Sequence, residues 1–297
     1  MPIVDCHVHL YPDEINRAPT EWARNAGEKL WELLCARVRK NGRAVQGFPS
    51  VLELLKAMDQ AGVERAILQA WYWEKHENCV AQNRFYRACV QAHPDRLAAC
   101  GTFHPVAGRE AVRAEIGWLA AEGFVGVGEM SPHSQNFAAN DPVWLNALED
   151  CAAKRLPVLL HVTEPNSKAY PGRVLTPLED FVIWATGFPQ TTFVLAHWGA
   201  RLPLDPALGA ALRASRNVFF DTAASPLLYD ASVFAEMIKA VGADRLMFGS
   251  DFPLVLYPQT ETQPSIASFV AQVKALGISE SDEIDFFSNT TKRVFLP

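Results

Sequence analysis

The stretch Pro2-Ile3-Val4-Asp5-Cys6-His7-Val8-His9, near the start of the chain, decides how the rest is interpreted. It is rich in apolar and β-branched residues, as strands are, and it ends in two histidines separated by one residue. Because side chains alternate across a strand, we expect His7 and His9 to point to one side, with Cys6 and Val8 on the other. Two imidazoles on one side of a strand end indicate a metal site.

Four later runs share this design, in which an apolar strand ends in a group that can bind a metal. Groups at the carboxyl ends of the parallel strands of one barrel can converge on one point. Imidazole and carboxylate groups suit zinc, manganese and iron. We therefore predict a divalent metal site, with zinc expected first and manganese as the alternative. The candidate ligands are His7, His9, Glu129, His161, His197 and Asp251.

Strand-like and helical stretches alternate along the whole chain. Further strands are expected at 64–70, 96–103 and 217–221, and helices at 51–61, 79–92, 108–122, 177–187, 205–215, 230–241 and 265–276, with one more starting at 141–142. Eight strand-then-helix units predict the α/β class and a (β/α)8 TIM barrel, with its active site at the carboxyl ends of the strands. A doubly wound open sheet is the alternative, and the lack of a Gly-x-Gly-x-x-Gly motif after the first strand disfavours it.

The stretch after the first strand, about residues 11–49, is too long for an ordinary loop between strand and helix. It contains an amphipathic piece over 22–38. We interpret it as an insertion that lies over the mouth of the barrel, within a single domain spanning residues 1–297.

Composition narrows the class of protein. Of the 297 residues, 49% are apolar and 20% are charged, which is ordinary for a soluble globular chain. The net charge of −6 argues against nucleic acid or an anionic membrane as the general partner. No apolar run approaches the roughly 18 residues of a membrane span, and a strand at residue 2 leaves no room for a signal peptide. We therefore expect a cytoplasmic protein with six reduced cysteines, namely Cys6, Cys35, Cys79, Cys89, Cys100 and Cys151.

The motifs together resemble a known family. The chain is similar to the amidohydrolase superfamily, in the amidohydrolase-related (amidohydrolase 2) branch of metal-dependent barrel hydrolases and decarboxylases. The resemblance covers nearly the whole chain, and its segments, in order, are 5–9, 160–161, 196–199, 249–253 and 289–295. Relatives are often dimers, and the aromatic-rich piece over 22–31 is a candidate homodimer surface.

The resemblance also implies roles for the candidate ligands. His7, His9 and His161 would be metal ligands. Asp251 would contact the metal or its bound water and move a proton. His197 would be a ligand to a second metal in a binuclear site, or a catalytic group in a mononuclear one. Both Asp251 and His197 are therefore candidate catalytic residues.

Glu129 decides between one metal and two. Binuclear relatives bridge their metals with a carboxylated lysine or a glutamate from the fourth strand, and this strand has no lysine. Glu129 is either such a bridge or a carboxylate that orients a ligand histidine. Both interpretations stay open at this stage.

The expected function is that of a metal-dependent hydrolase. A metal-bound water would attack the amide, ester or lactone carbonyl of a small substrate, cyclic or carboxylated. The alternative is a metal-dependent decarboxylase, but many of those carry Glu-x-His where this chain has His7-x-His9. A metal-dependent nuclease would need basic loops, and residues 71–74 are aromatic and acidic instead. A non-catalytic barrel that binds a small ligand would have no need of six converging groups.

Residues in the loops after the strands are candidates for substrate contacts. Trp71 and Trp73 follow the second strand, and His133 and Gln135 follow the fourth. Tryptophans there can form an apolar wall for a ring. Arg173 and Arg201 are candidates to bind a substrate carboxylate, although we favour solvent-facing salt bridges for them.

Overall fold

The computed structural model describes residues 2–296 and is a (β/α)8 TIM barrel, as expected. Within this range eight parallel strands pair in chain order. Cys6 N donates to Phe248 O at 2.9 Å and His9 N donates to Phe252 O at 2.7 Å, which closes the barrel between its last and first strands. The strands are β1 Ile3–Val8, β2 Val63–Leu68, β3 Leu97–Gly101, β4 Gly126–Met130, β5 Val158–Leu160, β6 Phe193–Leu195, β7 Val218–Asp221 and β8 Leu246–Met247.

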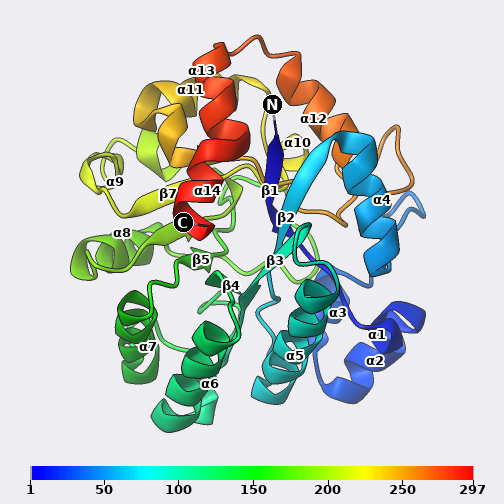
Figure 1. Cartoon of the computed structure of the whole chain (residues 1–297), viewed down its shortest axis with the longest axis vertical. Coiled ribbons are helices and arrows are strands. Elements are labelled where there is room, and N and C mark those ends of the chain that lie inside the picture. Colours follow the sequence, from blue (N-terminus) through cyan, green and yellow to red (C-terminus); the bar gives the residue numbers. More distant parts are fainter. Residues whose placement is uncertain (1, 297) are drawn as a thin grey trace.

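Helices surround these strands (Figure 1). The expected caps are present: Ser50 and Glu53 form a capping box at the start of α4, and Asp141 accepts from Val143 N at the start of α7. The helix expected at 205–215 is shorter and begins at Gly209, because residues 206–208 form a turn. The outer helices are α4 Val51–Ala61, α5 His76–Ala92, α6 Arg109–Ala121, α7 Pro142–Ala153, α8 Leu178–Gly187, α9 Gly209–Ala214, α10 Ser225–Leu228, α11 Ser232–Val241, α12 Ile266–Lys274 and α13 Glu280–Ile284.

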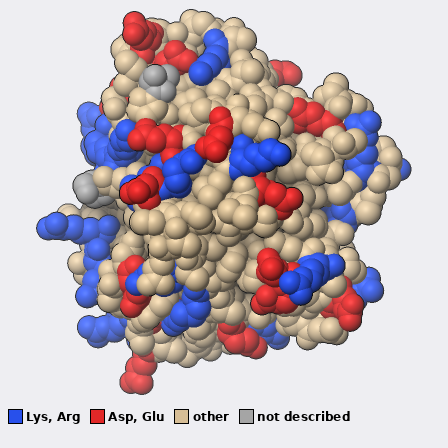
Figure 2. Space-filling view, turned by 45° about the vertical axis from the view of Figure 1, so that its right-hand side comes forward, with Lys and Arg blue, Asp and Glu red and all other residues tan. Residues whose placement is uncertain are grey.

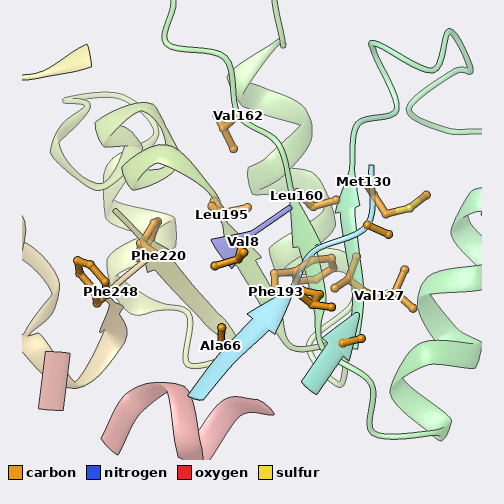
Figure 3. Close-up of a cluster of buried hydrophobic side chains, with 14 of the residues drawn as sticks. Val8, Ala66, Val127, Met130, Leu160, Val162, Phe193, Leu195, Phe220 and Phe248 are labelled. Atoms are coloured by element: carbon orange, nitrogen blue, oxygen red, sulfur yellow. The ribbon is translucent and has the colours of Figure 1, made fainter. Parts of the chain in front are cut away.

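The outward side chains of the strands form the main core against the helices. Figure 3 shows Val127, Leu160, Phe193 and Phe220 on neighbouring strands of this layer. All four are at most 1% exposed. Strands covered on their outer face by helices read as nearly continuous apolar runs, which is why they could be recognised in the sequence.

The interior of the barrel is filled by a second, smaller cluster. It includes Cys6, Ile67, Cys100 and Leu159 from the strands, and it ends at Phe295 from the last helix, α14 Thr290–Phe295. The free thiols of Cys6 and Cys100 serve here as small apolar groups. The helix α14 thus covers the barrel interior at the end where the strands begin, opposite to the carboxyl ends of the strands.

Two strands carry an extra residue where their ligands lie. On β1, three residue steps from Asp5 to Val8 lie opposite two steps on β2, and β4 shows the same mismatch from Val127 to Met130 opposite β5. Such a bulge interrupts the alternation of side chains. Val8 points outward as expected, but Cys6 lies in the interior cluster, so its expected orientation was wrong. The bulge turns His7 to the same side.

The insertion after β1 forms three short helices, α1 Asp13–Arg17, α2 Pro19–Ala26 and α3 Lys29–Leu34. The piece expected to be amphipathic over 22–38 is broken at Gly27, whose φ of +75° ends α2. These helices lie beside α5, where Trp31 packs against Trp73 (Figure 1). The part of the insertion that lines the cavity at the mouth of the barrel is the last residue of α3, Leu34, and the segment after it.

We predict that Phe295→Ala lowers the free energy of unfolding by about 3–5 kcal/mol, because it removes a buried aromatic ring from the interior cluster. Urea unfolding followed by circular dichroism would measure the change. Leu52→Ala is the control, since Leu52 is 70% exposed and its truncation should change stability by less than about 0.5 kcal/mol. Equal effects of the two variants would contradict the assigned role of α14.

Candidate metal centre

The six predicted ligands come together at the carboxyl ends of the strands, in two groups of three. His7, His9 and Asp251 form the first group, in which His7 Nε2 lies 3.1 Å from His9 Nε2 and Asp251 Oδ1 lies 3.5 Å from His9 Nε2. The second group is Glu129, His161 and His197. Strands far apart in the sequence therefore deliver these side chains to one place.

Glu129 lies between the two groups and faces both. Its Oε1 is 2.9 Å from His161 Nδ1 and 3.4 Å from His197 Nε2. Its Oε2 is 3.8 Å from the Nε2 atoms of both His7 and His9. The backbone before Glu129 can take this path because residue 128 is a glycine. In any other residue the Cβ would lie 2.6 Å from Leu159 Cβ, in the filled interior of the barrel. The carboxylate has the position of a bridge and also of a group that orients His161.

Oxygen acceptors fix the outer nitrogen of three of the histidines. His7 Nδ1 lies 2.8 Å from Asp221 Oδ2, His9 Nδ1 lies 2.8 Å from the Gln69 carbonyl, and His197 Nδ1 lies 2.9 Å from the Ala223 carbonyl. A carbonyl or ionised carboxylate only accepts, so each Nδ1 carries a hydrogen, and in the neutral ring each Nε2 presents a lone pair to the site.

This arrangement fits a metal ion. In the neutral histidines two lone pairs would face each other across 3.1 Å, with the Asp251 carboxylate beside them. That geometry is repulsive unless a cation or a proton lies among the three groups. Imidazole and carboxylate donors that converge in this way suit a divalent ion such as zinc or manganese.

Burial and charge shift the titration of the cluster in opposite directions. Burial alone would lower the pKa of His7, but Asp221, Glu129 and Asp251 outweigh it and raise the pKa to about 10. In the same way the pKa of His197 rises to about 9, mainly through Glu129. Burial would raise the pKa of Asp251, but the surrounding histidines lower it. Without a metal, the Asp251 carboxylate is therefore ionised beside protonated His7 and His197.

Asp221, at the end of β7, is a part of the site that we did not assign from the sequence. Besides His7, its carboxylate accepts from His197 N at 3.0 Å and from Ala223 N at 3.0 Å. Asp221 therefore holds the ring of His7 and the backbone of His197 in place. The signal was available, because Asp221 ends an apolar strand in the same way as Asp251 does.

A cavity of about 580 Å³ opens above the two groups, and five of the six predicted ligands line it. His7 lies behind them and is fully buried. Trp71 and Tyr72 line the cavity with their rings stacked 4.2 Å apart, and Tyr72 also lies 5.2 Å from His161. The wall next to the donors is thus aromatic.

Of the four residues predicted to contact substrate, one lines the cavity and three do not. Trp71 lines the cavity, whereas Trp73 packs under the insertion and donates its indole hydrogen to Gln82 at 2.6 Å. His133 lies 2.8 Å from Asp180, and the Gln135 amide donates to the Phe103 carbonyl at 3.1 Å. Trp73, His133 and Gln135 lie outside the cavity wall, because their side chains tie loops together.

The two predicted arginines also have structural partners. Arg173 donates to the carbonyls of Glu164 and Pro165, and the Arg201 guanidinium lies 5.4 Å from the centre of the Tyr229 ring. Neither lines the cavity. Arg37 and Arg39, both from the insertion, do line it. Among the described residues Arg39 donates side-chain hydrogen bonds to backbone carbonyls, whereas the Arg37 side chain has no hydrogen-bond or ion-pair partner. Sequence reasoning missed Arg37 because the segment after α3 has no periodic pattern.

Other surfaces say less about function. Among the described residues no helix is long and apolar enough to cross a membrane. On the face shown in Figure 2, basic and acidic side chains are interspersed among uncharged ones.

Comparison with solved structures finds the same fold in several enzymes. The 5-carboxyvanillate decarboxylase of Sphingomonas paucimobilis is 20% identical with a TM-score of 0.73, covering 99% of this chain and 98% of that one. The 5-carboxyvanillate decarboxylase of Novosphingobium aromaticivorans, in complex with manganese and a nitrobenzoic acid, is 17% identical with a TM-score of 0.75, covering 99% and 96%. A probable 2-pyrone-4,6-dicarboxylic acid hydrolase of Acinetobacter baumannii is 15% identical with a TM-score of 0.66, covering 99% of each chain.

At these identities the likeness shows the fold. No curated protein matches the chain. The amidohydrolase family model, however, matches residues 4–296, which is nearly the whole sequence. The chain therefore belongs to the amidohydrolase family.

Proposed function

We propose that this protein is a divalent-metal-dependent decarboxylase acting on a small ring compound that carries a carboxylate. The observation that carries the proposal is a cluster of six metal-binding groups beneath a cavity of about 580 Å³ with an aromatic wall. The two 5-carboxyvanillate decarboxylases among the compared structures support it. Decarboxylation, the alternative to hydrolysis in the sequence analysis, thereby becomes the first candidate.

His7, His9 and Asp251 are the groups that would hold the metal, with Glu129 and His161 adjoining them. A divalent ion held there would anchor an anionic group of the substrate and stabilise negative charge that develops during the reaction. The residues are suited to this task before any ion binds, because Asp221 and two backbone carbonyls already orient the histidine rings.

The cavity wall favours loss of carbon dioxide from a bound ring acid. A carboxylate that moves from water into an apolar site loses hydration. The transition state loses less, because its negative charge spreads into the ring as neutral carbon dioxide forms. Trp71, Tyr72, Leu227 and Leu254 supply such a wall. The electron pair of the broken carbon–carbon bond stays on the ring carbon, which must then take up a proton. His197 Nε2 faces the cavity and can hold and deliver that proton.

Hydrolysis of an amide, ester or lactone is the second candidate, and Glu129 favours it. Its two oxygens face the two groups of ligands from opposite sides. A carboxylate in that position can bridge two ions in a site that activates water. The probable 2-pyrone-4,6-dicarboxylic acid hydrolase among the compared structures has this type of activity.

The first test is a substrate panel that separates the two reactions. Protein loaded with manganese or zinc would be incubated with hydroxybenzoic acids, benzenedicarboxylic acids and cyclic esters. We expect carbon dioxide to be released from at least one ring acid, measured with carboxyl-labelled substrate, and no acid to be released from the esters. Ester opening without release of carbon dioxide would instead establish the hydrolase, and inactivity toward both classes would contradict the proposal.

We predict one tightly bound divalent ion per chain, by elemental analysis of protein purified without chelator. His7→Ala and Asp251→Asn should each lose the ion and the activity, while circular dichroism stays unchanged. Glu110→Gln, on an outer helix, is the control for Glu129→Gln. Two ions in the wild type, falling to one in Glu129→Gln alone, would assign Glu129 as a bridge and favour hydrolysis.

Metal binding should strengthen steeply as pH rises. Because the pKa of the proposed ligand His7 is raised to about 10, its proton competes with the metal at neutral pH and leaves as pH approaches this value. Each displaced proton makes the apparent affinity rise by about tenfold per pH unit. Competition with a chelator at pH 6–9 would measure this slope, and a flat profile would show that the histidines are not ligands.

A further inference from the structure

We propose that the substrate carries a second carboxylate, which Arg37 binds on the wall of the cavity formed by the insertion. This inference rests on the proposed action on a ring acid and names its substrate class, a small aromatic or cyclic dicarboxylate. Its basis is a half-buried guanidinium on the cavity wall whose hydrogen-bonding capacity the protein leaves unfilled.

The backbone around Arg37 is anchored, so its side chain has a defined position. The Arg37 carbonyl accepts from Val45 N at 3.3 Å across a short hairpin. The hairpin is tied to the loop after β8, because Gly47 N donates to Pro253 O at 2.8 Å and Arg39 donates to Val255 O at 3.1 Å. The insertion therefore presents Arg37 from a fixed wall.

The Arg37 side chain is half-buried and lines the cavity, yet its donors have few partners. Its Nε is buried and has no hydrogen-bond partner, and within residues 2–296 it forms no ion pair. Its guanidinium lies 5.9 Å from the centre of the Tyr170 ring, across the cavity wall. By contrast, Arg39 donates to two backbone carbonyls. Burying part of a guanidinium whose N–H groups have no acceptor costs free energy, unless an anion accepts hydrogen bonds from them.

The acids that line the cavity do not fill this role. Glu129 and Asp251 belong to the two groups of ligands, and Glu164 accepts from the Tyr229 hydroxyl at 2.7 Å. Among the described residues none of these acids forms an ion pair with Arg37, although all of them line the same cavity. A substrate with one carboxylate at the ligand groups would leave Arg37 unpaired, whereas a second carboxylate would satisfy it.

Aromatic side chains complete the receptor for such a molecule. Trp71 and Tyr72 lie near the ligand groups, and Tyr170 lies beside Arg37. A flat ring between them would contact aromatic faces, with one anionic substituent directed to the metal centre and the other to Arg37. The planar guanidinium fork matches a carboxylate in two parallel hydrogen bonds, which a lysine cannot reproduce.

The test measures binding of two probes that differ only in the second carboxylate, benzoate and isophthalate. Calorimetric titration of the metal-loaded protein should give tighter binding for isophthalate. In Arg37→Met, isophthalate should bind roughly ten- to hundredfold more weakly while benzoate binding stays unchanged. Arg37→Lys should recover only part of the loss. Lys40→Gln, which removes an exposed positive charge from the same hairpin, should leave both affinities as in the wild type.

Several outcomes would overturn the inference. These are equal affinity of the wild type for benzoate and isophthalate, no binding of either probe, an equal loss of both probes in Arg37→Met, and an equal loss of isophthalate in Lys40→Gln. Binding needs no turnover, so a protein that discriminates the probes through Arg37 but releases no carbon dioxide would refute the decarboxylase and retain the dicarboxylate site. If Arg37→Met does not fold, by circular dichroism, Arg37→Lys decides alone.

Discussion

The register between β1 and β2 is the constraint on which the site depends. Three residue steps on β1 lie opposite two on β2, so Cys6 and His7 both turn toward the inside of the barrel. Cys6 fills the apolar interior, and His7 begins the polar floor directly above it. The same mismatch between β4 and β5 turns Glu129 inward although Val127 points outward. Without these two bulges, regular alternation would place His7 and Glu129 among the outer helices.

Small residues beside the bulges make room for the inward side chains. A Cβ at Gly249 would lie 2.8 Å from His7 Cβ, and one at Gly126 would lie 2.8 Å from Cys100 Sγ. Asp5 then holds the bulged backbone of β1, since its carboxylate accepts from His7 N at 3.1 Å and from Ser250 N at 2.9 Å. The position of the first ligand is therefore fixed by backbone hydrogen bonds as well as by packing.

This explains which parts of the molecule could be predicted. Apolar strands covered by helices have a strong pattern, so the barrel and the polar residue at each strand end were recognisable from the sequence. A bulge leaves no such pattern, because it depends on pairing with a neighbouring strand. The orientation of Cys6 was therefore wrong, while His7 and His9 face one site for a different reason than simple alternation. Asp221 had the same signal as the other strand ends and was left unassigned.

The loops were the least predictable part of the molecule. Some of their side chains line the cavity, and others hold the loops in place. The aromatic residues after β2 look alike in sequence, yet Trp71 lines the cavity and Trp73 anchors the insertion. Likewise Arg39 holds the hairpin, whereas Arg37, two residues before it, lines the cavity and has a buried Nε without a hydrogen-bond partner. The carboxyl ends of the strands position the candidate metal-binding groups, and barrels of this design can share that arrangement. In our proposal the insertion supplies the charge that selects a substrate, and it does so from a segment separate from the two bulged strands that position the metal ligands.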